Sequence, residues 1–218
     1  VEEIIPAGKG LQYLTLEELK KKLRDKGYFA QERKRPLPSL PKKVGVVTSL
    51  AGAAIKDIYH VIQRRYPGMP VVLYPAQVQG EGAPAKLARG INELGQNEGI
   101  DVIILARGGG SSDDLGAFND ELVAEAVFNS PKPIISAVGH EIDYTIADLV
   151  ADARAATPSV AGELAVPIKE DLERGIVRLQ DRLKSVMGNI LDREKMRLAF
   201  LANNNIIKRP ERWTAKYL

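Results

Sequence analysis

The sequence contains no cysteine among its 218 residues. Disulfides, thiolate zinc sites and cysteine nucleophiles are therefore excluded, and the absence suits the reducing interior of a cell. The sequence also lacks a signal-type leader and any apolar run near the roughly 18 residues that a membrane span needs. We therefore expect a soluble, cytoplasmic protein with no membrane partner.

Charge is present in ordinary amount but unevenly placed. The net charge is +3, with 44% hydrophobic and 27% charged residues, which is typical of a soluble globular protein. Residues 168–218 carry 12 Lys and Arg against 7 Asp and Glu, and a second basic run lies between Lys20 and Arg35. Such runs are either solvated helix faces or a track for nucleic acid, and both interpretations stay open.

The middle of the chain alternates between short apolar segments and longer amphipathic ones. Short apolar runs separated by helices of ten to fifteen residues indicate βαβ units. We therefore predict an α/β fold with an open, doubly wound, mainly parallel sheet and helices on both faces. Ligands bind such sheets beyond the carboxyl ends of the strands. The predicted strands are 44–47, 71–74, 101–105 and 133–138, and the predicted helices are 51–65, 84–98 and 119–129.

Three regions are predicted along the chain. Residues 1–42 form a helix over 16–26 and a proline-rich connector, and residues 43–165 form the α/β domain. After Pro158 the pattern changes to a long helix, and residues 166–218 form a helical coiled-coil arm. Leu172, Ile176, Leu179, Leu183, Val186 and Ile190 recur in steps of 4, 3, 4, 3 and 4 residues. That spacing is typical of a coiled-coil seam, although an ordinary core helix remains an alternative.

A glycine-rich loop follows the third predicted strand. Its glycines expose backbone N–H groups and let a phosphate approach closely, while Arg107 can clamp phosphate oxygens with its planar fork. The loop matches neither the Walker A pattern nor the dinucleotide-binding pattern. A flexible surface turn is the alternative interpretation. The predicted phosphate-binding residues of this loop are Gly108, Gly109, Gly110, Ser111 and Ser112.

A histidine and an aspartate follow the fourth predicted strand. Asp143 lies three residues after His140 and can orient its imidazole for general acid–base catalysis. With Asp148 and Asp152 downstream, a site for a hard metal ion is equally compatible, and a structural histidine is the simplest alternative. No G-x-S-x-G motif supports a serine hydrolase. Further hydroxyl donors expected at the phosphate site are Thr48, Ser49, Thr157 and Ser159.

These segments together resemble the large subunit of bacterial exodeoxyribonuclease VII. The matching strings are VVTS at 46–49, GAAIKDI at 52–58, VQG at 78–80, RGGGS at 107–111, DL at 114–115, FNDE at 118–121, PIISAVGHE at 133–141 and the pattern D-x-T-x-x-D-x-x-A-D-x-R-A-x-T-P-S at 143–159. They fall within roughly residues 5–167. Two differences stand out: nothing before residue 40 resembles the family's N-terminal OB-type domain, and Gly116 stands where the family often has tryptophan. We therefore expect a truncated chain with a shortened arm.

The resemblance implies hydrolysis of single-stranded DNA from its ends into oligonucleotides with 5′-phosphates. It also implies small subunits docked along the helical arm. The family's active-site residues fall on Asp57, Arg107, His140 and Asp143; the residues alone would make Asp57 a surface carboxylate.

The expected roles follow from phosphodiester chemistry. His140 is general base or acid, Arg107 and the loop amides hold phosphate oxygens, and Asp57 positions the water. We name no required cofactor; if a metal is used, we expect Mg²⁺ bound by Asp57, Asp143 and Asp148. The alternatives are a non-catalytic nucleic-acid or nucleotide-binding module and a metal-dependent phosphohydrolase of a small phosphoester. Without an OB-type domain, we expect the isolated chain to bind and degrade single-stranded DNA poorly.

Overall fold

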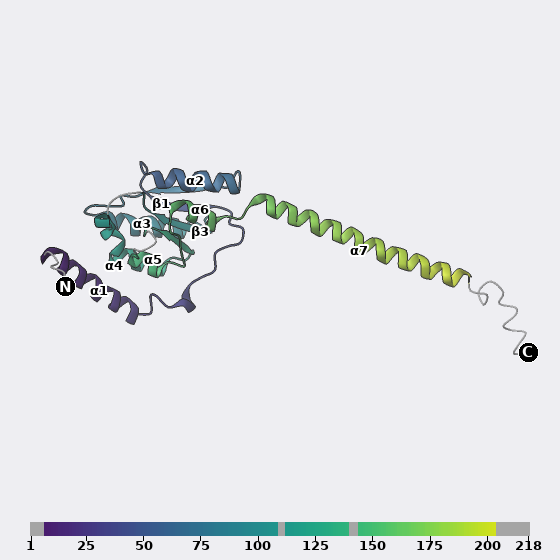
Figure 1. Cartoon of the computed structure of the whole chain (residues 1–218), viewed down its shortest axis with the longest axis horizontal. Coiled ribbons are helices and arrows are strands. Elements are labelled where there is room, and N and C mark those ends of the chain that lie inside the picture. The colour runs from purple at the N-terminus through teal and green to yellow at the C-terminus, as the bar shows by residue number, and fades with distance from the viewer. Residues whose placement is uncertain (1–6, 109–111, 140–143, 204–218) are drawn as a thin grey trace, which may run out of the picture. The chain divides into compact units, whose positions relative to one another are not determined.

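The computed structural model describes residues 7–108, 112–139 and 144–203, with the backbone alone for 7–13 and 112–114. The chain divides into two units, Val1–Lys169 and Glu170–Leu218. Figure 1 shows a layered α/β arrangement in the first unit and one long helix in the second.

The first unit is built on a five-stranded sheet whose neighbouring strands are all parallel, in the order β2-β1-β3-β4-β5. The parallel sheet and four of its strands were predicted within one residue at each end. The fifth strand was missed, because two residues carry no readable hydrophobic pattern. The strands are β1 (Val44–Thr48), β2 (Val71–Pro75), β3 (Val102–Ala106), β4 (Ile134–Ala137) and β5 (Ala153–Arg154).

Helices or helical turns separate the strands. The predicted helices are confirmed, although their ends differ from the prediction. Residue 119, where a helix was predicted to begin, instead ends η2, and α4 begins at Glu121. Two short helices, α5 and α6, were not predicted as separate elements. The helical elements are α1 (Ala7–Asp25), η1 (Gln31–Arg33), α2 (Ala53–Arg65), α3 (Ala83–Gln96), η2 (Ser112–Asn119), α4 (Glu121–Asn129), α5 (Ile146–Val150), α6 (Pro158–Ala165) and α7 (Lys169–Asn203).

Two hydrophobic clusters cover the sheet, and alternate residues of each strand enter different clusters. In β1, Val44 and Val46 pack with α2 and α6, whereas Val47 packs with α3, α4 and α5. Figure 1 likewise shows α2 on the side of the sheet away from α4 and α5. Helix α6 lies very close to α2: a methyl group at Gly162 would come within 3.2 Å of the Ile58 carbonyl oxygen. These clusters fix where each strand ends, and hence where its following loop begins.

The segment before β1 packs against the same unit. Leu23 of α1 is fully buried in the cluster with α3, α4 and α5. The ring of Tyr28 stacks on that of Phe128 at 4.0 Å between centroids, and the Arg33 guanidinium lies 4.6 Å from the Phe128 ring centroid. The predicted connector is therefore held in place by side-chain contacts with α4.

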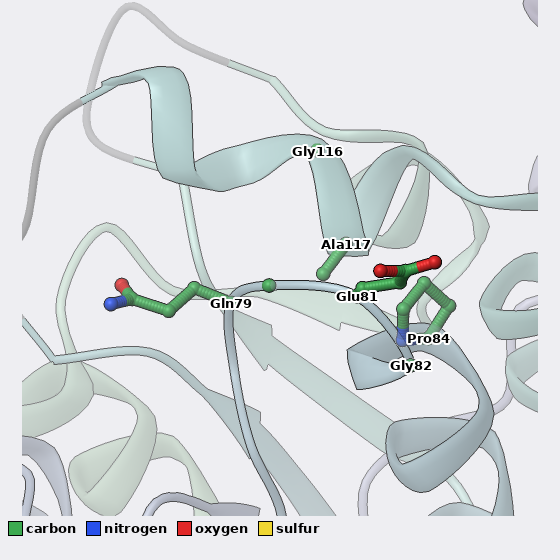
Figure 2. Close-up of a pocket in the computed structure, with 7 residues that line it drawn as sticks. Gln79, Glu81, Gly82, Pro84, Gly116 and Ala117 are labelled. Atoms are coloured by element: carbon green, nitrogen blue, oxygen red, sulfur yellow. The ribbon is translucent and has the colours of Figure 1, made fainter.

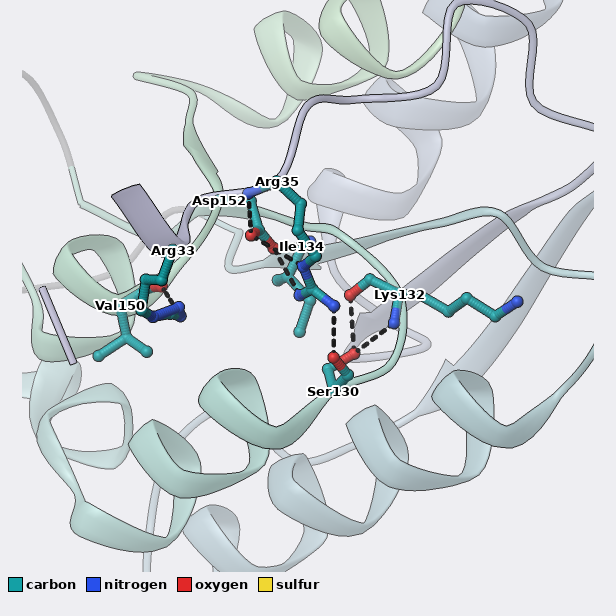
Figure 3. A network of polar contacts seen from close by, with 7 residues as sticks. All are labelled: Arg33, Arg35, Ser130, Lys132, Ile134, Val150 and Asp152. Carbon is teal, nitrogen blue, oxygen red and sulfur yellow. Dashed lines mark hydrogen bonds and ion pairs between the residues drawn. The ribbon is translucent and has the colours of Figure 1, made fainter. Parts of the chain in front are cut away.

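A partly buried ion pair joins this connector to the amino ends of β4 and β5 (Figure 3). Arg35 donates from its backbone N, Nε and Nη2 to the Asp152 carboxylate at 2.8, 3.1 and 2.8 Å, and Ile134 N donates to the same carboxylate at 2.8 Å. The Asp152 side chain is 1% exposed. Burial alone would raise the pKa of Asp152, but the hydrogen bonds from Arg35 and Ile134 outweigh it and hold that pKa below its ordinary value. The Asp152 carboxylate is therefore ionised, and its bonds to Arg35 and Ile134 stabilise the fold.

The second unit contains most of α7, which matches the long helix predicted after Pro158 once α6 is set apart. Its apolar seam is exposed: Leu179 and Leu183 are 67% and 63% exposed. A helix with such a stripe gains stability when a partner covers it. An exposed stripe does not by itself show a partner helix, and the coiled coil therefore stays a prediction. No helix in residues 7–108, 112–139 and 144–203 is long and apolar enough to cross a membrane.

Candidate functional site

The carboxyl ends of β1, β3 and β4 bring several predicted site residues to one edge of the sheet. Thr48 is the last residue of β1, and Arg107 follows β3 directly. The Arg107 backbone N donates to the Ala137 carbonyl oxygen of β4 at 3.2 Å. Because β1 and β3 are neighbours and their following helices leave on opposite faces, a crevice at this edge is the usual ligand position of such sheets.

The N-terminus of α2 opens at the same edge. Gly52 is its N-cap residue and supplies no side-chain cap. The first N–H groups of a helix have no partner within the helix, and the helix dipole makes this end attractive to anions. A methyl group added at Gly108 would lie 3.6 Å from both the Ala53 and the Ala54 backbone N. The missing Cβ of Gly108 therefore leaves space in front of two helix amides, which suits a phosphate oxygen.

The side chains around this space are buried to different degrees. Arg107 is 7% exposed, so its guanidinium lies largely inside the edge rather than in solvent. Ser49 is half-buried, and its Oγ would be 2.6 Å from a methyl group at Gly52, so it sits beside the α2 N-cap. Thr48 is fully buried, and its Oγ1 has no hydrogen-bond partner among the described residues. Of these hydroxyls, Ser49 is the more accessible, and phosphate binding by either residue stays a prediction.

A second arginine reaches this edge, and the sequence pattern did not single it out. Arg154 of β5 donates from Nη2 to the Gly139 carbonyl oxygen at 3.5 Å. Its guanidinium carbon also lies 3.9 Å from the centroid of the Tyr144 ring. Strand β5 is only two residues long and carries no readable pattern, so the sequence did not predict this placement. Arg154 appeared in the sequence only as one residue of the 143–159 pattern.

Asp57 lies on α2, four residues after Ala53. Residues four apart occupy the same face of a helix, about one turn of 5.4 Å along the axis. Both Ala53 and Asp57 are exposed. The helix therefore places the Asp57 carboxylate about one turn from the amides in front of Gly108.

Several other predicted site residues have structural roles. Asp148 is 3% exposed and accepts hydrogen bonds from Ser136 Oγ at 2.6 Å and from Thr145 N and Oγ1 at 2.9 and 2.7 Å. Thr145 and Asp148 form a capping box at the start of α5. Asp152, expected among the acids around His140, instead lies at the amino edge of β4. The density of acids in the sequence therefore does not form one cluster.

The remaining hydroxyl donors lie at the start of α6. Thr157 is its N-cap and accepts from Val160 N at 3.2 Å, while Ser159 is half-buried in the first turn. Thr157 thus has a capping role, and phosphate binding by either residue stays a prediction. Ser112 begins η2. Gly109, Gly110, Ser111, His140 and Asp143 lie outside the described residues.

Within the described ranges, no group of three His, Cys, Asp or Glu side chains is placed to hold a metal ion. Asp148 has its carboxylate oxygens occupied by hydrogen bonds. It is therefore a poor fit to the Mg²⁺ ligand set expected from the sequence.

A cavity of about 350 Å³ lies beside this edge, between the β2–α3 loop and η2. In Figure 2, Gly116 and Ala117 of η2 face Glu81, Gly82 and Pro84. The positive φ angles of Gly80 and Gly82, 90° and 83°, make the loop turn sharply around the cavity. Its described lining contains a carboxylate and no Lys or Arg, so it suits a phosphate less well than the space in front of Gly108. The lining residues are Gln79, Gly80, Glu81, Gly82, Pro84, Gly116 and Ala117.

The fold defines an α/β protein with a parallel sheet, and its candidate site lies at the carboxyl ends of the strands. The family model described as "Exonuclease VII, large subunit" matches residues 28–217. The chain therefore belongs to the exonuclease VII large-subunit family. The resemblance inferred from the sequence motifs is confirmed.

Curated relatives agree with this assignment. The chain is 50% identical to the exodeoxyribonuclease 7 large subunit of Moorella thermoacetica, over 96% of this chain and 52% of that protein. It is 46% identical to the protein of the same name from Halothermothrix orenii, over 97% and 52%. It is 44% identical to that of Streptococcus pneumoniae strain R6, over 100% and 49%. The chain thus spans about half the length of the curated relatives it matches.

Proposed function

We propose that the chain supplies the catalytic unit of an exodeoxyribonuclease that hydrolyses single-stranded DNA from its ends to oligonucleotides with 5′-phosphates. The observation that carries this proposal is the space in front of the Ala53 and Ala54 amides, left open by Gly108 and flanked by Arg107. Membership of the exonuclease VII large-subunit family supports the same reaction.

The chemistry requires few protein groups. A water oxygen attacks phosphorus, the bond from phosphorus to the 3′ oxygen breaks, and that oxygen leaves with a proton. The α2 amides and Arg107 hold the non-bridging oxygens as negative charge grows on them. Asp57, one turn further along α2, positions the water.

His140 and Asp143 complete the proposal. His140 takes the proton of the water or gives one to the leaving oxygen, and Asp143 orients the imidazole. If Mg²⁺ takes part, Asp57 and Asp143 are its proposed ligands, because the hydrogen bonds of Asp148 leave that carboxylate poorly placed.

The wider organisation is part of the same proposal. Residues 43–165 form a doubly wound catalytic domain after the 1–42 segment, in the cytoplasm. Residues 166–218 form the coiled-coil arm, on which the small subunits dock. The exposed apolar seam of α7, with Leu179 and Leu183, is the surface that this docking would cover.

The decisive test is a nuclease assay on 5′- and 3′-end-labelled single strands, using the chain assembled with the family's small subunit, with and without EDTA. The proposal predicts short 5′-phosphorylated products from wild type and their loss with His140→Ala. Strand binding without cleavage by wild type would instead establish the non-catalytic binding module. Hydrolysis of a small chromogenic phosphodiester, abolished by EDTA and without DNA cleavage, would establish the small-phosphoester alternative.

A further inference from the structure

Tyr144 is an exposed aromatic side chain at the edge that carries the candidate site. It is 53% exposed, although it directly precedes the buried N-cap residue Thr145. A large aromatic ring left in solvent beside a candidate site calls for a role, since its burial would otherwise stabilise the fold.

One face of this ring is covered by Arg154. The guanidinium carbon lies 3.9 Å from the ring centroid, a distance at which the cation and the aromatic face attract each other. Arg154 also donates from Nη2 to the Gly139 carbonyl oxygen, at the end of β4. The guanidinium is therefore fixed between the ring and the strand end, and it holds the ring in one orientation. About half of Tyr144 stays exposed, so ring surface that Arg154 does not cover is open to solvent.

The position relates this ring to the candidate phosphate site. Arg154 contacts Gly139 after β4, and the Arg107 backbone N is hydrogen-bonded to Ala137, two residues before Gly139. The Gly108 space thus lies after the end of β3, and the Tyr144–Arg154 pair lies at the ends of β4 and β5 of the same sheet. Each phosphate of a single strand links two nucleosides, so a strand with a phosphate in front of Gly108 carries a base on either side of it.

We propose that the exposed face of Tyr144, backed by Arg154, is a stacking platform for one base of the single-stranded DNA. This inference rests on the proposed function, and adds the group that holds a base next to the phosphate. An aromatic face stacks on any base, and a cation behind it adds attraction for the polyanion, so the platform binds without sequence preference.

A scan with abasic sites tests the platform. The probe is a fluorescein-labelled dodecathymidylate in which one abasic site is moved along the strand. Its binding to the chain assembled with the family's small subunit is measured by anisotropy at low salt. For wild type, an abasic site at the stacked position weakens binding about tenfold. Tyr144→Ala weakens binding of the intact strand by a similar factor and removes the extra penalty at that position. Tyr144→Phe keeps both.

Tyr59 offers a matched control, because it is also 53% exposed but lies on the outer surface of α2. Tyr59→Ala should leave the abasic profile of wild type intact. A wild-type profile that is flat, or a penalty that survives in Tyr144→Ala, overturns the platform while the proposed function stands. Absence of any strand binding by the wild-type chain assembled with the small subunit overturns the proposed function, and the platform with it.

Discussion

Polar residues have different roles at the two edges of the sheet. At the amino edge, the Asp152 carboxylate is enclosed by Arg35 and by the Ile134 amide. At the carboxyl edge, Arg107 follows β3 and Arg154 ends β5, with β4 between them, and the missing Cβ of Gly108 leaves room in front of the Ala53 and Ala54 amides. A charge paired with an opposite charge stabilises the fold, whereas helix amides with room in front of them are available to an anion. We therefore predict that mutations at the amino edge affect stability and that mutations at the carboxyl edge affect activity.

The largest expected effect lies at the carboxyl edge. Arg107→Ala should lower kcat/KM for single-stranded DNA by about 1000-fold, because a donor to the transition-state charge is lost. Arg107→Lys keeps the charge but lacks the planar fork, and should still lose about 100-fold. The measurement is end-labelled strand cleavage by the assembled enzyme, with thermal melting as a check of folding. Arg89→Lys, an exposed arginine on α3, is the matched control. Cleavage at the wild-type rate by a folded Arg107→Lys variant would contradict a functional role of the carboxyl edge.

The next effect lies at the amino edge and concerns stability. Asp152→Asn leaves Arg35 facing a neutral amide in a buried setting and should lower the free energy of unfolding by about 3 kcal/mol. Urea unfolding measures this loss, and strand cleavage per folded molecule should stay at the wild-type level. Glu93→Gln, which removes one partner of an exposed ion pair, should leave the urea midpoint unchanged. A loss of cleavage in folded Asp152→Asn would show that the two edges are not separate in function.

Gly108→Ala sharpens the comparison by changing one methyl group. The new Cβ makes ordinary contacts at 3.6 Å with the Ala53 and Ala54 nitrogens, so the fold should tolerate it. It occupies the space proposed for a phosphate oxygen, and binding of a labelled dodecathymidylate should weaken about tenfold. Gly116→Ala is the control, because nothing lies within 4 Å of its added methyl group. Equal affinities of the two variants would place the phosphate elsewhere.

The smallest effect is a pH dependence at the amino edge. The pKa of Asp152 is lowered in the folded state, so its contribution to stability is complete above the unfolded pKa and is lost as pH falls through the folded one. The stability difference between wild type and Asp152→Asn should therefore shrink as pH falls below the ordinary Asp pKa and through the lowered pKa of folded Asp152. Urea midpoints at a series of pH values measure it. A difference that is constant down to pH 2.5 would contradict an ionised Asp152.

Sequence patterns predicted the sheet well because its strands are short apolar runs between clear helix signals. Arg107 and Gly108 could be placed at the carboxyl edge from the strand that precedes them. The separation of Asp148 and Asp152 could not be predicted: they are four residues apart in sequence, yet Asp148 is hydrogen-bonded to Ser136 inside β4 and Asp152 to the Ile134 amide at the amino end of β4. Arg154 was missed as a site residue because β5 is only two residues long and carries no readable pattern. The open space at Gly108 depends on how α2 packs against β3, which a sequence pattern does not contain.

The central claim is that the α2 amides and Gly108 form the phosphate site, and amide NMR tests it most directly. A ¹⁵N-labelled chain titrated with a short oligothymidylate should show the largest shifts at the Ala53 and Ala54 amides, and Gly108→Ala should abolish them while Gly116→Ala keeps them. Strand binding that leaves the Ala53 and Ala54 amides unshifted in the wild-type chain would contradict the claim.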